Sequence, residues 1–165
     1  MLDLTLLEPG DVLVTVADYT NPLHWLFAWG AGSKYIHTTI YLGDGLEWSI
    51  EGFGSRVRPV GTDKYQEAYR AREEVFGAAA ARVASRTKIT EYDIPHLIFL
   101  GLQESVLHIP NNKRANLNFS TKAKICSEGV TDIYVAVGYD IVPGFENGQT
   151  MPRDIPTSDK LYRVA

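Results

Sequence analysis

The sequence predicts a single domain, residues 1–165, in which short β-strands and α-helices are mixed. Three observations support this prediction. The composition, with 45% hydrophobic and 22% charged residues, is typical of a globular domain with a real core. The first third of the chain contains two β-rich runs separated by a glycine-rich turn, which is typical of a hairpin. The later segments carry alanine-rich and apolar residues at helical spacing.

The charge balance excludes some classes of partner. Sixteen basic and twenty acidic residues give a net charge of −4, which argues against a nucleic-acid or anionic-membrane surface. The longest apolar stretches, 23–29 and 94–102, are far shorter than the roughly 20 residues of a transmembrane helix. The first ten residues lack a secretory signal pattern. We therefore expect a cytoplasmic location, or delivery by a lysis or phage-type route.

Residues 11–16 follow a Pro-Gly turn and are mostly apolar, which predicts a buried strand. Residues 22–29 predict a short helix, with Asn21 as its N-cap and Pro22 at its first position. Residues 57–60 predict a further strand, and Pro59 places it at the edge of a sheet because proline cannot donate to the ladder.

The runs 36–42 and 46–52 predict a hairpin around Gly43-Asp44-Gly45. A three-residue loop, which pairs Leu42 with Leu46, collects the apolar side chains on one face. A two-residue loop would mix polar and apolar side chains, so we favour the longer loop. In the favoured register Ile40 lies opposite Trp48, and His37 lies opposite Glu51 with Cβ atoms about 5 Å apart.

Three helices are predicted in the rest of the chain. Residues 63–86 have helical composition, with Thr62 as the cap. Residues 93–108 have Asp93 as the cap and apolar residues along one side. Residues 125–137 predict a third helix, with Cys126 in its first turn.

Cys126 is the only cysteine, so it forms no internal disulfide and no cysteine-based zinc site. It is therefore a buried inert thiol, a surface thiol or a nucleophile. The first turn of a helix favours the thiolate through its unpaired N–H groups and the helix dipole. A small buried hydrophobic side chain is the competing interpretation, and the cysteine by itself does not decide between them.

Of the four histidines, His37 alone sits in a predicted strand with a carboxylate opposite it. A carboxylate that holds the ring would fix its tautomer and stabilise the imidazolium. A solvated polar ladder is the alternative. Glu47 is the rival carboxylate, but the register pairs it with Tyr41. The other three histidines, His24, His96 and His108, are expected to be ordinary helix residues. A metal site is not predicted, because the sequence has no spacing typical of metal ligands.

Several short motifs resemble the permuted papain-like cysteine hydrolases, the YiiX-like branch of the NlpC-type superfamily. The stretch Ser33-Lys34-Tyr35-Ile36-His37-Thr38-Thr39-Ile40-Tyr41-Leu42-Gly43-Asp44-Gly45 resembles the family's hairpin, and Ile50-Glu51-Gly52 resembles its I-E-A ending. In the second half, Tyr92-Asp93, Ile125-Cys126-Ser127-Glu128-Gly129-Val130 and Gly138-Tyr139-Asp140-Ile141-Val142-Pro143 resemble its Y-D, Y-C-S-E-L-V and G-x-D-L-x-P motifs.

This resemblance implies an α+β, circularly permuted papain-like fold, in which a small antiparallel sheet or half-barrel packs against the helix of the nucleophile. It also implies a Cys-His-Glu triad, with Cys126 as nucleophile, His37 as base and Glu51 as its orienter. Tyr92 would assist the oxyanion. The chain departs from the family at Ile36 and at Gly129, where a looser helix or a close packing contact is expected.

The chemistry implied is amide hydrolysis through a thioester acyl-enzyme, without a cofactor, with a peptide or amide substrate such as a peptidoglycan stem peptide. Two alternatives stay open: a lipid acyl hydrolase or acyltransferase of a related branch, and an inactive binding or assembly module. The lipid-acting branch usually has N-C-E-H-F at its cysteine, unlike Ile-Cys-Ser-Glu-Gly here. Several aromatic residues could line a cleft or belong to the core: Trp25, Trp29, Trp48, Phe53, Tyr35.

Overall fold

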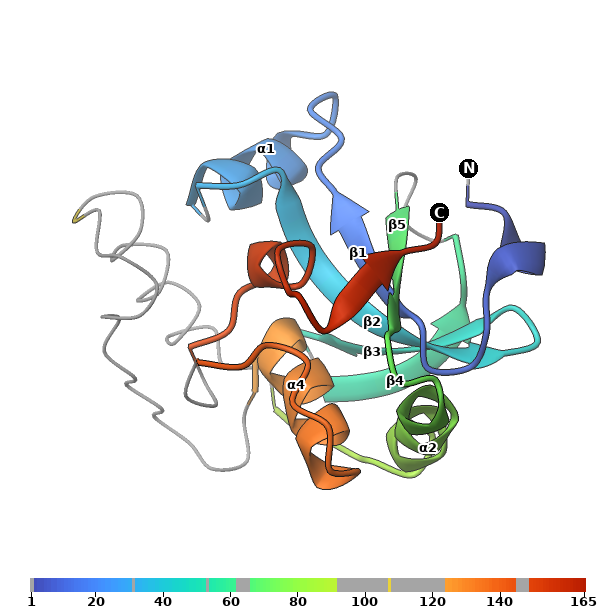
Figure 1. Cartoon of the computed structure of the whole chain (residues 1–165). Coiled ribbons are helices and arrows are strands. Elements are labelled where there is room, and N and C mark those ends of the chain that lie inside the picture. Colours follow the sequence, from blue (N-terminus) through green and yellow to red (C-terminus); the bar gives the residue numbers. More distant parts are fainter. Residues whose placement is uncertain are drawn as a thin grey trace.

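The computed structural model describes residues 2–30, 32–52, 54–61, 66–91, 107, 124–144 and 149–165. In these ranges an antiparallel sheet packs against α-helices, so the fold is α+β (Figure 1). The elements are β1 (Val12–Val16), α1 (Pro22–Gly30), β2 (Tyr35–Gly43), β3 (Leu46–Glu51), β4 (Gly54–Pro59), β5 (Gln66–Ala71), α2 (Val75–Ala84), α4 (Cys126–Ala136) and β6 (Leu161–Arg163), with 3-10 helices η1 (Leu4–Leu6) and η3 (Pro152–Asp154).

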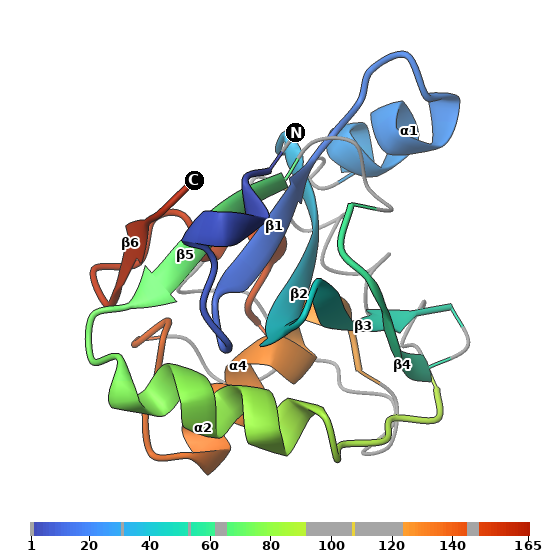
Figure 2. The ribbon, with the colours of Figure 1, turned by 90° about the vertical axis from the view of Figure 1, so that its right-hand side faces the viewer.

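The sheet has six strands in the order β4-β3-β2-β1-β5-β6, and all neighbours are antiparallel. It is strongly twisted, so that β3 and β4 run across the direction of β1 and β5 (Figure 2). The strand that contains Pro59 lies at an edge, as predicted. The strand at 11–16 and the helix at 22–29 are also confirmed, and the Trp25 N–H donates to the Asn21 carbonyl at the start of α1.

The hairpin has the predicted register, but the predicted loop is wrong. Ile40 lies opposite Trp48 and Tyr41 opposite Glu47, as expected. Leu46, however, pairs with Gly43 rather than with Leu42, because a bulge follows Tyr41 and the turn is only two residues long. Both turn residues have positive φ, 53° and 71°, which is the conformation of a tight hairpin turn: Asp44, Gly45. The bulge adds the residue that the shorter turn removes, and the register beyond it is therefore preserved.

The predicted helix at 63–86 is wrong in its first part. Residues 66–71 form β5, which pairs with β1 and β6, and the helix α2 begins only at Val75. Glutamine, glutamate and alanine favour helices, but pairing on both sides and burial of Glu67, Ala68 and Tyr69 override that preference. The predicted helix at 93–108 falls outside the described residues except for Leu107.

Helices α2 and α4 cover one face of the sheet. α4 contacts β2 and β3, while α2 contacts β2, β5 and α4. The core lies between these layers, and its largest fully buried side chains include Trp48, Tyr134 and Ile50. Tyr134 also donates a hydrogen bond to the Gly10 carbonyl at the start of β1, which ties α4 to the sheet. In the described part of the chain, no helix is both long and apolar enough to cross a membrane.

Gly129 lies where α4 comes closest to the sheet. A Cβ at this position would lie 2.1 Å from Ile50 Cδ1 and 3.3 Å from Trp48 Cη2. Both neighbours are almost completely buried, so neither has free space to move into. Of the two explanations for this glycine, close packing is therefore the correct one. It allows α4, which starts at Cys126, to approach β3 closely.

We expect Gly129→Ala to lower the free energy of unfolding. Overpacking a core costs about 1–3 kcal/mol, which outweighs the gain of about 1 kcal/mol that alanine offers in a helix. The double variant Ile50→Val/Gly129→Ala removes the clashing Cδ1 atom and should lose less stability than the sum of the two single variants. Urea unfolding of the four proteins measures this, and a more stable Gly129→Ala protein would contradict it.

Candidate active site

Cys126 is the first residue of α4, as predicted. Ile125 is the N-cap and has extended backbone angles, but it makes no side-chain capping bond to the first turn. The thiol is buried, with 2% of the residue exposed. The cysteine therefore meets the positive end of the helix dipole in a place with little water, where the dipole is poorly screened.

The His37 ring lies against the Cys126 thiol. Burial raises the pKa of this thiol, but the charge of His37 and a hydrogen bond with its ring lower it. Together with the Thr38 groups described below, these effects bring the pKa to about 7, from an ordinary value of 9.0. The structure thus brings the His37 ring and the Cys126 thiol together. The arrangement makes a thiolate available at neutral pH.

Thr38 supplies further donors to the sulfur. Its backbone N–H and its side chain both lower the Cys126 pKa. The side chain is fully buried, and its hydroxyl has no oxygen or nitrogen partner among the described residues. One strand segment, His37-Thr38, therefore faces the thiol with an imidazole, an amide and a hydroxyl.

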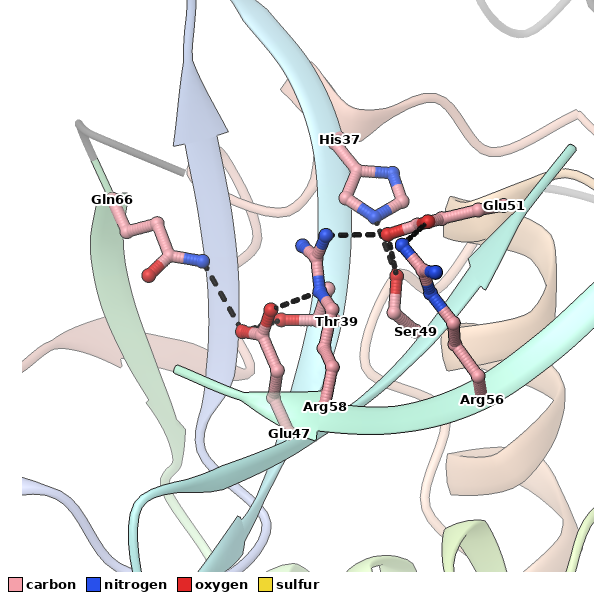
Figure 3. Close-up of polar contacts among 8 residues, drawn as sticks. All are labelled: His37, Thr39, Glu47, Ser49, Glu51, Arg56, Arg58 and Gln66. Carbon is pink, nitrogen blue, oxygen red and sulfur yellow. Dashed lines mark hydrogen bonds and ion pairs between the residues drawn. The ribbon is translucent and has the colours of Figure 1, made fainter. Parts of the chain in front are cut away.

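The second side of the His37 ring faces Ser49. Nε2 lies 2.8 Å from Ser49 Oγ, and Ser49 Oγ lies 3.3 Å from Glu51 Oε1 (Figure 3). The paired register of β2 and β3 ends at Thr39 and Ser49. The predicted direct pairing of His37 with Glu51 is not part of this register; the two side chains are instead connected through the hydroxyl of Ser49.

Two arginines from β4 bind the Glu51 carboxylate. Arg56 forms an ion pair with Oε2, and Arg58 forms one with Oε1 (Figure 3). Arg58 also binds Glu47, with its Nε 2.6 Å from Oε1. Glu47 is fully buried and accepts further hydrogen bonds from Thr39 at 2.8 Å and from a glutamine at 3.2 Å: Gln66. Arg58 therefore connects the two carboxylates of β3.

The remaining candidates are either outside the described residues or not in contact with this cluster. Tyr92 is outside the described residues, as are His96, His108 and Phe53. His24 accepts a hydrogen bond from the Asp18 N–H in front of α1. Among the aromatic candidates, Trp48 belongs to the core, whereas Trp25 and Trp29 are exposed on α1. Within the described ranges, no group of three or more His, Cys, Asp or Glu side chains is placed to hold a metal ion.

Four residues of this site were not predicted as site residues: Thr38, Ser49, Arg56 and Arg58. Thr38 and Ser49 lie within two residues of His37 and Glu51, but small hydroxyl residues in strands are too common to single out. Arg58 lies opposite Glu47 in the β3–β4 register. The alternation of arginines in Arg56-Val57-Arg58, next to a predicted edge strand, could have predicted this contact. Residues two apart in a strand point to the same face, which here is the face that carries the β3 carboxylates.

No family model matches the sequence, and no curated protein matches it. Among solved structures, the crystal structure of the metalloprotein YiiX from Escherichia coli O157:H7 aligns with a TM-score of 0.62. The two chains are 14% identical, and the alignment covers 96% of each. The chain has the YiiX fold. At this level of identity the likeness to YiiX concerns the fold alone, an antiparallel sheet packed against helices.

We expect Thr38→Val to raise the pKa of Cys126 above its value of about 7, because the variant removes a hydroxyl that stabilises the thiolate. The pH dependence of the thiolate's ultraviolet absorbance measures this at pH values below tyrosine ionisation, and the signal belongs to one residue since the chain has one cysteine. Thr131→Val is the matched control, because that buried hydroxyl bonds to two carbonyl groups of α4 instead. An unchanged titration in Thr38→Val would refute the assignment.

Proposed function

We propose that this chain is a cysteine hydrolase that cleaves an amide bond through an acyl-enzyme on Cys126, with His37 as the base and Glu51 as the supporting carboxylate. The observation that carries the proposal is the position of the buried Cys126 thiol, at the first residue of α4 and in hydrogen-bond contact with the His37 ring, which brings its pKa to about 7. Burial alone would raise it, so the ionised form owes its stability to His37 and Thr38. An inert core cysteine has no need of such partners.

The reaction follows from these positions. His37 takes the thiol proton, and the sulfur attacks the carbonyl carbon of the substrate. When the tetrahedral intermediate collapses, the C–N bond breaks, and the imidazolium gives its proton to the leaving amine. Water then attacks the thioester while His37 accepts one of its protons. When this second intermediate collapses, the C–S bond breaks, the carboxylic acid is released, and the imidazolium returns its proton to the sulfur, which regenerates the enzyme.

The oxyanion of the intermediate needs hydrogen-bond donors. The first N–H groups of a helix have no partner within the helix, and Cys126 is the first residue of α4. We propose that the backbone N–H of Cys126 supplies one donor and that Tyr92 supplies a second through its hydroxyl. Both would act on charge that develops next to the nucleophile.

YiiX, whose structure aligns with this one, is described as a metalloprotein. The residues of this chain do not fit such a role in the part that the structure describes, where no group of three or more potential ligands converges. Cys126, the softest available ligand, is instead engaged with His37 and Thr38. The steps proposed above use protein groups only.

We propose a peptide of the cell-wall type, such as a peptidoglycan stem peptide, as the substrate. This choice rests on the resemblance of the motif around Cys126 to the peptidase branch of the permuted hydrolases. Such a substrate lies outside the cytoplasm, so the proposal requires the protein to reach that compartment. A cytosolic amide would need no delivery.

A lipid acyl substrate is the second candidate, and α1 is the observation that favours it. This helix has no charged residue, and three of its aromatic side chains are between 48% and 62% exposed: Trp25, Phe27, Trp29. α1 also contacts β2, the strand that carries His37. Exposed tryptophan and phenylalanine on an uncharged helix are typical of surfaces that meet lipid.

We expect His37→Ala to slow the alkylation of Cys126 by iodoacetamide at neutral pH. If the pKa returns to the ordinary value, the thiolate fraction at pH 7 falls about 50-fold, and the higher nucleophilicity of the more basic thiolate leaves a net loss of roughly tenfold. His24→Ala is the matched control, because it removes a histidine that belongs to α1. Equal alkylation rates in His37→Ala and the wild type would refute the proposed pair.

Turnover should distinguish the substrates. We expect the wild-type protein to release an amine from peptidoglycan stem peptides, and mass spectrometry should detect an acyl group on Cys126 during the reaction. Cys126→Ser and His37→Ala should abolish release. Hydrolysis of phospholipid vesicles with no peptide cleavage would support the lipid candidate, and absence of both activities in a protein whose Cys126 is unreactive would identify an inactive binding module.

A further inference from the structure

The side chain of Ser49 lies between His37 and Glu51, two of the predicted site residues. Ser49 is in β3 and is fully buried. Its hydroxyl contacts two groups: His37 Nε2 at 2.8 Å, and Glu51 Oε1 at 3.3 Å (Figure 3). A buried hydroxyl in contact with both a histidine and a carboxylate determines what each of them can do.

The direction of these two hydrogen bonds follows from counting protons. A serine hydroxyl has one hydrogen, and an ionised carboxylate only accepts. Glu51 accepts hydrogen bonds from Arg56 and Arg58 in two ion pairs, which is the role of a carboxylate acceptor. The Ser49 proton therefore goes to Glu51. The oxygen of Ser49 is then the acceptor for His37, so Nε2 of the neutral ring carries the ring proton.

We infer that Ser49 is a positioning residue that fixes the tautomer of His37, and that Glu51 acts on the ring through it. With the proton on Nε2, the lone pair of the neutral ring is on Nδ1, the nitrogen that accepts the proton of Cys126. The inference rests on the proposed function, because it concerns the base of that reaction. It deepens that function by assigning a role to a residue that the sequence motifs passed over.

The anchoring of Glu51 explains why the serine is needed. Two guanidinium groups already compensate the Glu51 charge, so little of it is left to stabilise an imidazolium. Arg58 is itself fixed by the fully buried Glu47. What this assembly supplies to His37 is a fixed acceptor in a fixed place, and that acceptor is Ser49 Oγ. The carboxylate orients the serine, and the serine orients the ring.

Nitrogen-resolved NMR of His37 tests the tautomer directly. The Cys126→Ser background is suitable, because no thiolate then holds the ring protonated, and spectra at alkaline pH report the neutral form. We expect a protonated Nε2 and an unprotonated Nδ1. A ring with its proton on Nδ1 would overturn the inference, and this measurement does not depend on a variant at position 49.

Ser49→Ala then tests the role of the hydroxyl. We expect the neutral ring to become a mixture of both tautomers. Turnover should fall, but by less than the roughly 10²- to 10⁴-fold that loss of a general base costs, because the ring itself remains. Ser49→Thr retains the hydroxyl and should restore the single tautomer. Ser55→Ala is the matched control, because this serine of the neighbouring strand donates to the carbonyl of Thr87 and should change neither readout.

The two proposals fail in different ways. If His37→Ala leaves Cys126 alkylation unchanged, the proposed hydrolase is wrong. If His37→Ala slows alkylation but Ser49→Ala leaves both tautomer and turnover unchanged, only the role of Ser49 is wrong. If the His37 ring of Ser49→Ala is a mixture of tautomers while the urea unfolding of this variant matches that of Ser55→Ala, Ser49 has a positioning role rather than a structural one.

Discussion

The candidate site depends on the close contact between α4 and the sheet at Gly129. Because this residue has no side chain, Ile50 and Trp48 of β3 fill the space beside the helix backbone. Three residues earlier the same helix begins, and Cys126 is thereby held against His37 and Thr38 of β2. A bulkier residue would push the helix away from the strand, and the thiol would lose the groups that ionise it. The packing of the core and the chemistry of the cysteine therefore share one constraint.

Within that contact, two opposing electrostatic effects set the state of the thiol. Burial disfavours a thiolate, whereas the imidazole and the donors of Thr38 favour it. The same exclusion of water that makes the thiolate costly also strengthens each of these interactions. A site of this type is sensitive to the loss of a single donor, because little solvent is present to replace it. The Thr38 hydroxyl is fully buried, so water cannot readily take its place beside the sulfur.

The sequence predicted the parts of this arrangement that local chemistry determines. Apolar alternation predicted the register of β2 and β3, even though the bulge after Tyr41 changed the loop. The helix over 125–137 with Cys126 in its first turn was also predicted, and α4 begins at Cys126. The prediction of a helix at β5 was wrong, because the residues of β5 favour a helix by composition. Its pairing with β1 and β6, which are distant in the chain, cannot be predicted from local composition. Ser49 was missed for a related reason: a register pairs backbones, but side chains of different length meet along diagonals that a register does not specify.

The buried ion pair of Glu47 and Arg58 is best understood through the site rather than through stability. Removing two charges from water costs several kcal/mol per ion, and an apolar pair of similar volume in the middle of a sheet often stabilises a fold as well or better. This pair has a second connection, since the same arginine binds Glu51, which accepts the hydrogen bond of Ser49. Thr39 and Gln66 fix the far end of the pair. The network thus fixes the His37 ring by side-chain contacts. This ring lies just beyond the end of the β2–β3 ladder, where backbone pairing no longer holds the two strands together.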